Sequence, residues 1–322
     1  MARDEKPSVP GLQTSATPTF VVGAERSGST LLRLMLDQHS KLSFSHQMEF
    51  LIDYTPPGRP HPEVLDLIGR LAGDPVFRRS KLDVGAYPFR NARELIESLL
   101  YQRGEGCAAI GGTVHRHFAR VLDHWPHARF IHLVRDPRAV APSAVRMGWD
   151  GTPYAAAERW VESEQEWDAL ADRLDDDAWT EVRFEDLATR SEEALTGLCE
   201  FMGVEYEPAL LEFHQHSTYS KVDGKIADAW RKNPEQWARD VEMRAGDMML
   251  ERGYMPEVSD VPEVGSLEIA ALSMRERVMR TKLRQERMGV ELWAKSLVAR
   301  RLRRWVEKVH SEQSEAESTF IK

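Results

Sequence analysis

The stretch that most constrains the fold is FVVGAERSGSTLLRLML, residues 20–36. An apolar run of strand length enters a turn bounded by Gly23 and Gly28, and a leucine-rich segment with helical spacing follows at once. In a strand–turn–helix of this kind, backbone N–H groups at the start of the helix hold anionic oxygens. We therefore expect a strand over residues 19–24, a helix over 29–39 and an anion-binding loop between them.

The loop departs from the phosphate-loop pattern G-x-x-x-x-G-K-[ST], because Ser29 stands where that pattern has lysine. Arg26 instead supplies a fixed positive charge inside the turn, and a guanidinium matches the fork of an oxyanion. We expect an anionic ligand without the long polyphosphate that a loop lysine grips. The alternative is an ordinary strand–helix turn with a solvated arginine.

Strand-like and helical segments alternate beyond this loop. Apolar runs of strand length occupy residues 107–112, 129–135 and 179–187, and residues 41–54 form an extended segment that runs into a helix. Helical patterns occupy residues 61–73, 91–104, 117–125, 137–149 and 191–204. This alternation predicts an α/β fold of P-loop type, with three layers and a central parallel sheet flanked by helices. Ligands of such sheets bind at the carboxyl ends of strands, where the turns at residues 23–30 and 135–143 both fall.

We expect a disordered lead-in over residues 1–18, a main domain over 19–256 and a helical C-terminal extension over 257–322. The extension can support a homo-oligomer or, less readily, contact a membrane or a lipid. The net charge of −9 argues against a nucleic-acid partner. Because no apolar run approaches about 20 residues, we expect no transmembrane segment. The two cysteines are too few for a disulfide framework, which predicts a cytoplasmic location. The histidines form no metal-binding constellation.

A second anion-binding element follows the run FIHLV at residues 130–134. Arg135 closes that run and Ser143 follows eight residues later, so the pair could hold a second phosphate. An ion pair between Arg135 and Asp136 is the alternative.

Together these stretches resemble the sulfotransferases that use 3′-phosphoadenosine 5′-phosphosulfate (PAPS) as donor. RSGSTLLRLMLDQH resembles the 5′-phosphosulfate loop of that family, and FIHLVRDPRAVAPSAV resembles its 3′-phosphate motif. The segments VRFEDL, LCEFMGV and MLERGY also occur in the family's order. The resemblance covers residues 19–254 and is nearest to the bacterial and tyrosylprotein-sulfotransferase-like branch.

The resemblance implies PAPS as donor, adenosine 3′,5′-bisphosphate (PAP) as product, no metal, and a hydroxyl of a small molecule, sugar, lipid or peptide as acceptor. It assigns the 5′-phosphosulfate to the loop residues Arg26, Ser27, Gly28, Ser29 and Thr30, with Arg26 opposing charge on the bridging oxygen. It assigns the 3′-phosphate to Arg135 and Ser143, with Arg146 a weaker candidate. Residues 217–232 resemble the segment that closes over the nucleotide, which makes Ser217, Ser220 and Lys225 candidates.

The residues expected to carry the chemistry depart from the family. Gln47 stands where the family has its glutamate base, and glutamine cannot take a proton. Glu49 lies on the same face of an extended segment, so we assign it the base role. His46 is the alternative base, and a salt bridge of Glu49 to Arg26 or Arg33 is the structural alternative. The family's K-[TD]-P lysine is also absent, and the nearest basic groups are His115 and Arg116. These departures keep open a donor-binding pseudoenzyme and, less readily, a P-loop small-molecule kinase.

Overall fold

The structure is a computed structural model, and it describes residues 9–12, 14–55, 61–215, 217, 223–257 and 265–299. The described residues form two compact units. The first unit contains the residues up to Arg135 together with Glu162–Ala227, and the second contains Asp136–Val161 and the residues from Asp228 onward. The domain boundaries that the sequence predicts, after residues 18 and 256, stay a prediction.

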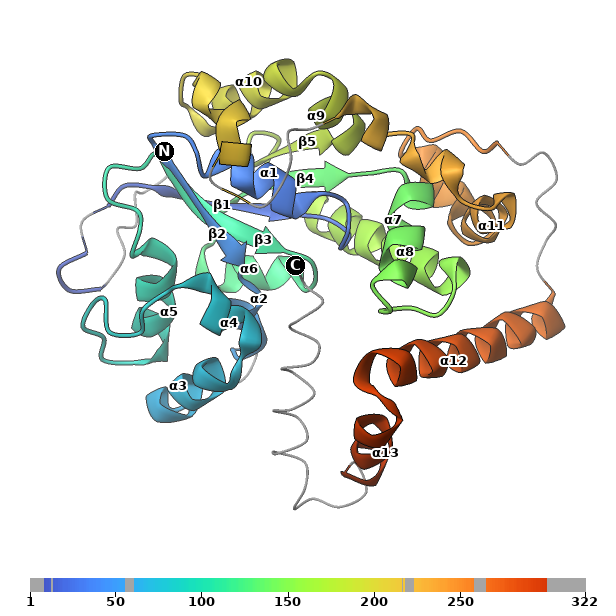
Figure 1. The fold of residues 1–322 in the computed structure, drawn as a ribbon. Coiled ribbons are helices and arrows are strands. Elements are labelled where there is room, and N and C mark those ends of the chain that lie inside the picture. Colours follow the sequence, from blue (N-terminus) through green and yellow to red (C-terminus); the bar gives the residue numbers. More distant parts are fainter. Residues whose placement is uncertain are drawn as a thin grey trace. The chain divides into compact units, whose positions relative to one another are not determined.

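Five parallel strands form the sheet of the first unit, in the order β2-β3-β1-β4-β5 (Figure 1). The strands are β1 (Thr17–Val22), β2 (Leu42–Gln47), β3 (Ala109–Val114), β4 (Arg129–Val134) and β5 (Trp179–Arg183). Strand β1 lies between β3 and β4, so the strand order reverses there. In open α/β sheets such a point of reversal is where ligands bind, outside the carboxyl ends of the strands.

Apolar side chains leave this sheet on both faces, because successive residues of a strand point to opposite sides. Phe20 and Val22 of β1 enter a core built with helix α5 (Ala92–Tyr101). Val21 enters a second core, which α1 (Ser29–Leu36) and α10 (Ser191–Met202) complete. The predicted parallel sheet with helices on both faces is therefore confirmed.

The remaining elements of the first unit are short. They are α2 (Glu49–Asp53), α3 (Val64–Gly73), α4 (Pro75–Ser80), η1 (Phe118–Arg120), α6 (Val121–His124), α9 (Phe184–Thr189), η2 (Pro208–Gln215) and η3 (Gly224–Ile226). Helix α8 (Pro153–Ala171) was not predicted, and its residues are divided between the two units.

The strand predicted over residues 179–187 is shorter in the structure. Strand β5 ends at Arg183, and α9 begins at the next residue, Phe184. Glu185 and Asp186 lie in the first turn of α9, where carboxylates interact favourably with the helix dipole. The alternating apolar pattern of VRFEDL therefore hides a strand-to-helix junction.

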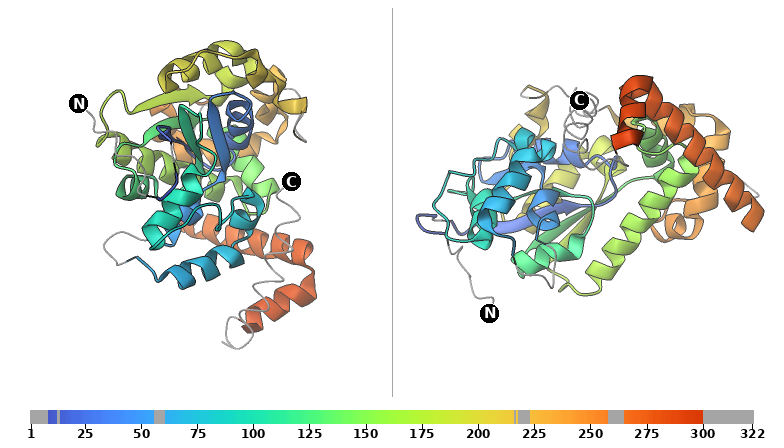
Figure 2. Two further views of the ribbon diagram at one scale, coloured as in Figure 1. Left: turned by 90° about the vertical axis from the view of Figure 1, so that its left-hand side faces the viewer. Right: turned by 90° about the horizontal axis from the view of Figure 1, so that it is seen from below.

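The second unit is helical in its described residues. Its elements are α7 (Pro137–Arg146), the start of α8, η4 (Ala229–Lys232), α11 (Glu235–Glu251), α12 (Ser266–Met288) and α13 (Val290–Ala299). Helices α12 and α13 follow one another at the C-terminal end of the described chain and are drawn in red in Figure 2. No helix among the described residues combines the length and the apolar character needed to cross a membrane.

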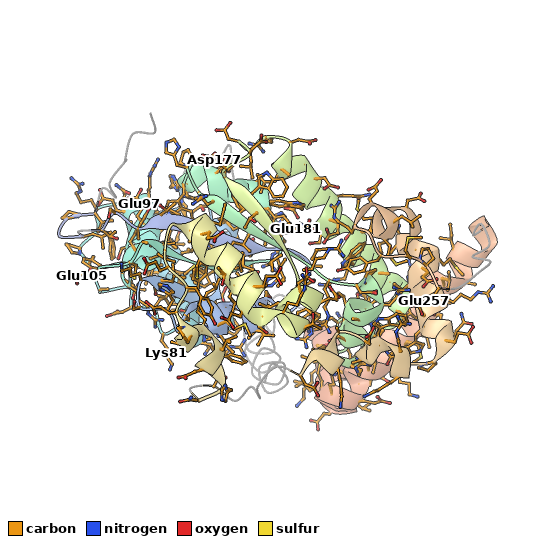
Figure 3. All side chains as sticks on the ribbon, turned by 90° about the horizontal axis from the view of Figure 1, so that it is seen from above. Lys81, Glu97, Glu105, Asp177, Glu181 and Glu257 are labelled. Atoms are coloured by element: carbon orange, nitrogen blue, oxygen red, sulfur yellow. The ribbon has the colours of Figure 1, made fainter. Side chains whose placement is uncertain are left out.

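Arg138 ties α7 to the rest of the second unit. Asp136 caps α7 by accepting a hydrogen bond from the backbone N–H of Arg138 (2.8 Å), and Pro137 occupies the first turn, as predicted. The buried guanidinium of Arg138 contacts both oxygens of Asp136 and donates to Glu242 Oε1 (2.9 Å). The same Glu242 oxygen accepts the backbone N–H of Glu257, which is labelled in Figure 3. These contacts fix the start of α7 within the second unit.

Candidate active site

The loop between β1 and α1 has the backbone geometry of an anion-binding turn. Gly23 has φ 139°, and a side chain there would lie 2.4 Å from the carbonyl oxygen of Leu133. Gly28 has φ 104° and is the N-cap of α1. Arg26, at φ 74°, also has a left-handed backbone, which is uncommon for a residue other than glycine. The loop therefore turns sharply between two glycines, as predicted, with an arginine at its strained position.

The Phe184 ring packs against Gly28 of this loop. An added Cβ on Gly28 would lie 2.3 Å from Cδ2 of Phe184, so only glycine fits against the ring. The guanidinium of Arg135 lies over the same ring, with Cζ 3.8 Å from its centroid. The Phe184 ring thus contacts both the anion loop, at Gly28, and the guanidinium of Arg135. No site role was predicted for Phe184, because the sequence places it inside a strand over residues 179–187, whereas it begins α9 in the structure.

Arg135 contacts the loop directly. Its Nη1 donates to the backbone carbonyl of Arg26 (3.3 Å), and its Nη2 lies 3.4 Å from the carbonyl oxygen of Ile226. The sequence predicted that the loop and Arg135 lie at the ends of neighbouring strands, and β1 and β4 do pair in the sheet. The Arg135 side chain thus lies against the backbone of the loop at this edge of the sheet.

A chain of three side chains leads from the loop to the carboxyl ends of β2 and β3. The hydroxyl Oγ of Ser29 lies 2.8 Å from Nε2 of His115, and Nδ1 of His115 lies 2.8 Å from Oε1 of Glu49. The same Glu49 oxygen accepts the backbone N–H of His115 (3.0 Å). Glu49 is therefore ion-paired with His115, and within the part of the chain that the structure describes it forms no ion pair with Arg26 or Arg33, the structural alternative.

His115 and Glu49 stabilise each other's charged forms. Both side chains are buried, and burial by itself raises the pKa of Glu49, but its hydrogen bond and charge interaction with His115 hold the pKa below its ordinary value. Burial opposes protonation of His115, yet the hydrogen bond and the charge of Glu49 raise the pKa of His115. The pair thus favours its charged forms, an imidazolium and a carboxylate. His115 lies against Ser29, the position where a phosphate loop carries its lysine.

Gln47 and His46, at the end of β2, have different surroundings. Gln47 places Nε2 3.4 Å from Nδ1 of His115. His46, on β2, has its pKa lowered to about 4, by burial first and then by the charges of Arg33 and Arg103. At neutral pH His46 is therefore uncharged.

The remaining predicted site residues lie elsewhere in the chain. Thr30 is on the first turn of α1. Ser143 is half-buried on α7, and Arg146, three residues later on the same helix, is exposed and donates to Asn233 Oδ1 (3.0 Å). Lys225 is exposed in η3. Ser220 lies outside the described residues.

The comparisons with known proteins agree with these motifs. The model of the sulfotransferase family matches residues 18–208. No curated protein sequence matches the chain. Among solved structures, the sulfotransferase domain from the curacin biosynthetic pathway is similar, with a TM-score of 0.52 and 19% identity, over 72% of this chain and 97% of that one.

The sulfotransferase domain of the Synechococcus PCC 7002 olefin synthase is also similar, with a TM-score of 0.50 and 22% identity, over 75% of this chain and 98% of that one. These structures share the fold, and the match to the family model spans both anion-binding motifs up to Arg135 and Ser143. The prediction of a sulfotransferase is confirmed: the chain belongs to the sulfotransferase family.

Proposed function

We propose that this protein transfers a sulfuryl group from PAPS to a hydroxyl group of a small-molecule, sugar, lipid or peptide acceptor. The observation that carries the proposal is the hydrogen bond between the Arg135 guanidinium and the Arg26 carbonyl. It joins the two elements that the resemblance assigns to opposite ends of one nucleotide. A site for one phosphate needs only the loop and Arg26. The position of Arg135 against the loop backbone therefore supports a second phosphate beside the first.

The loop residues suit the 5′-phosphosulfate. Backbone N–H groups at the start of α1 and the fixed charge of Arg26 favour an oxyanion there. Ser27 is 1% exposed, and among the described residues its hydroxyl has no hydrogen-bond partner. A buried hydroxyl of this kind costs free energy unless a ligand satisfies it, which supports an anion in the loop.

The 3′-phosphate is the expected ligand of Arg135, on the sequence motif that it shares with Ser143. A guanidinium binds a phosphate through two parallel hydrogen bonds, and the ring of Phe184 restricts how far this one can move. The donor specificity that follows is for adenosine nucleotides that carry a 3′-phosphate.

His115 and Glu49 form the proposed acid–base unit. The acceptor oxygen attacks the sulfur in line with the bond to the bridging oxygen, the new S–O bond forms as the old one breaks, and PAP leaves. The acceptor proton passes to the Glu49 carboxylate of the pair. His115, as an imidazolium beside Ser29, opposes the charge that develops on the leaving phosphate, together with Arg26.

Isothermal titration calorimetry with PAP tests the donor assignment. The wild type should bind PAP, and Arg135→Ala should weaken binding by at least about tenfold, since a charge-assisted contact contributes about 1.5–3 kcal/mol. Lys81→Ala is a matched control, because Lys81 is an exposed cation at the C-cap of α4. Absence of PAP binding by the wild type, or equal binding by Arg135→Ala, contradicts the proposal.

Sulfuryl transfer from PAPS to a panel of alcohols, sugars and tyrosine peptides tests the chemistry. Glu49→Gln should reduce kcat by about 10²–10⁴-fold, the usual contribution of a general base. Full turnover by Glu49→Gln removes the base assignment, and PAP binding without turnover on any acceptor favours the donor-binding pseudoenzyme. Magnesium-dependent turnover of ATP would instead indicate the kinase.

A further inference from the structure

Helix α12 contacts the turn between α7 and α8 through one of its faces. Glu276, Arg280 and Arg287 lie on this face, because positions separated by 4, 7 and 11 residues nearly superpose on a helix of about 3.6 residues per turn. The turn that they contact comprises residues 147–152, with the sequence MGWDGT. Helix α12 lies beyond the residues that the sulfotransferase family model matches (Figure 1).

Glu276 binds the start of α8. Its carboxylate accepts the backbone N–H of Gly151 (3.0 and 2.8 Å to the two oxygens) and the hydroxyl of Thr152 (3.1 Å), and Glu276 is 8% exposed. Gly151 packs in close contact with α12, because an added Cβ would be 2.6 Å from both the backbone nitrogen of Arg280 and the backbone oxygen of Glu276. A carboxylate is favoured at this helix N-terminus by the exposed N–H groups and the helix dipole.

Arg287 binds the end of α7. Its Nη2 donates to the backbone carbonyl of Arg146 (2.6 Å), a carbonyl in the last turn of α7. Gly148, with φ 65°, makes room for this guanidinium, since an added Cβ would lie 2.6 Å from Cζ of Arg287. A cation is favoured at a helix C-terminus, so the acid and the base of α12 each meet the helix end that suits their charge.

The contacts of α12 reach the residues that the resemblance assigns to the 3′-phosphate. Arg146 itself carries the carbonyl that Arg287 binds. Met147 donates its N–H to the carbonyl of Ser143 (3.0 Å), which links the turn to Ser143. Movement of α12 away from the turn would release the last turn of α7, on which Ser143 and Arg146 both lie.

We infer that α12 is a brace for donor binding, in which Glu276 and Arg287 are positioning residues that hold Ser143 and Arg146 in place for the 3′-phosphate of the nucleotide. This inference rests on the proposed function. Neither residue touches the donor, and both act through the backbone at the two ends of the turn.

The test compares two nucleotides that differ only in the 3′-phosphate, PAPS and adenosine 5′-phosphosulfate, by equilibrium binding without acceptor. Arg287→Ala removes the contact to α7, and Gly151→Ala inserts a methyl group against the backbone of α12. Each variant should lower the affinity for PAPS by about tenfold, the equivalent of one hydrogen bond of about 1.4 kcal/mol. The affinity for adenosine 5′-phosphosulfate should not change. Arg284→Ala, an exposed residue of the same helix, is the control and should bind both as the wild type does.

Each other outcome overturns the inference or the function. If both variants keep the wild-type preference for PAPS, α12 does not position the 3′-phosphate ligands, while the proposed function stands. If both nucleotides are weakened equally, with a lower Tm, α12 has only a structural role. If the wild type binds neither nucleotide, the proposed function itself is wrong.

Discussion

Replacing Gly28 by alanine tests the packing beneath the anion loop. Alanine at φ 104° leaves the favoured backbone regions, which costs about 1–2 kcal/mol. Its Cβ would also lie 2.3 and 2.5 Å from Cδ2 and Cε2 of Phe184. Phe184 is 2% exposed, so its ring has no room to move away, and overpacking of this kind costs about 1–3 kcal/mol. Gly28→Ala should therefore lower the free energy of unfolding by about 2–5 kcal/mol.

Gly203→Ala separates the two contributions. Gly203 has φ 73°, and no atom lies within 4 Å of an added Cβ, so this variant carries the backbone cost alone. Urea denaturation followed by tryptophan fluorescence measures both free energies of unfolding. Gly28→Ala should be less stable than Gly203→Ala by about 1–3 kcal/mol. Equal losses would refute the contact between Gly28 and Phe184.

The same variant has a consequence for ligand binding. Because the guanidinium of Arg135 packs on the Phe184 ring, displacement of the ring moves Arg135 as well. Gly28→Ala should weaken PAP binding, whereas Gly203→Ala, at the C-cap of α10, should bind PAP as the wild type does. Calorimetry on the folded variants measures this difference.

The remaining predictions concern buried charges. Glu49→Gln should cost about 3–5 kcal/mol of stability, because it leaves His115 buried without its partner. Because the pKa of Glu49 is lowered on folding, its ionised form stabilises the protein above pH 4.5, and this stabilisation is lost as the pH falls. Because the pKa of His115 is raised, its protonated form stabilises the protein fully below pH 6.5, and this stabilisation is lost as the pH rises further. Urea denaturation across pH should thus show the largest difference from wild type between these values, and a difference that grows above 6.5 would contradict the pairing. Arg138→Ala should lower the free energy of unfolding by about 3–5 kcal/mol in the same assay, because it leaves the buried carboxylates of Asp136 and Glu242 without their shared cation. Arg284→Ala should change the stability little.

The parts of the site that lie within one short stretch of chain were predictable. The glycine turn after β1 and the arginine after β4 each follow from local pattern, and the rule for parallel sheets places them at the same edge. The assignment of Glu49 came from its spacing to Gln47. Its partner could not be predicted, because His115 is 66 residues away and pairs with Glu49 only through the β2–β3 register.

The contacts between helices and strands could not be predicted from the sequence for the same reason, since they join residues that are far apart in the chain. Phe184 reads as part of a strand, and its position under Gly28 depends on how α9 packs against the sheet. The sequence predicts a helical extension over residues 257–322, and α12 lies within that range. Its docking depends on Gly148 and Gly151, which locally resemble ordinary turn glycines.

The backbone of Arg26 bears on why an arginine stands at this position. Glycine would adopt φ 74° at no steric cost, whereas arginine is held there against its own preference. A sequence optimised for folding alone would place glycine in the turn. Under the proposed function, the side chain is kept for the charge that it brings to the donor, and selecting variants of this protein for heat resistance would tend to replace it.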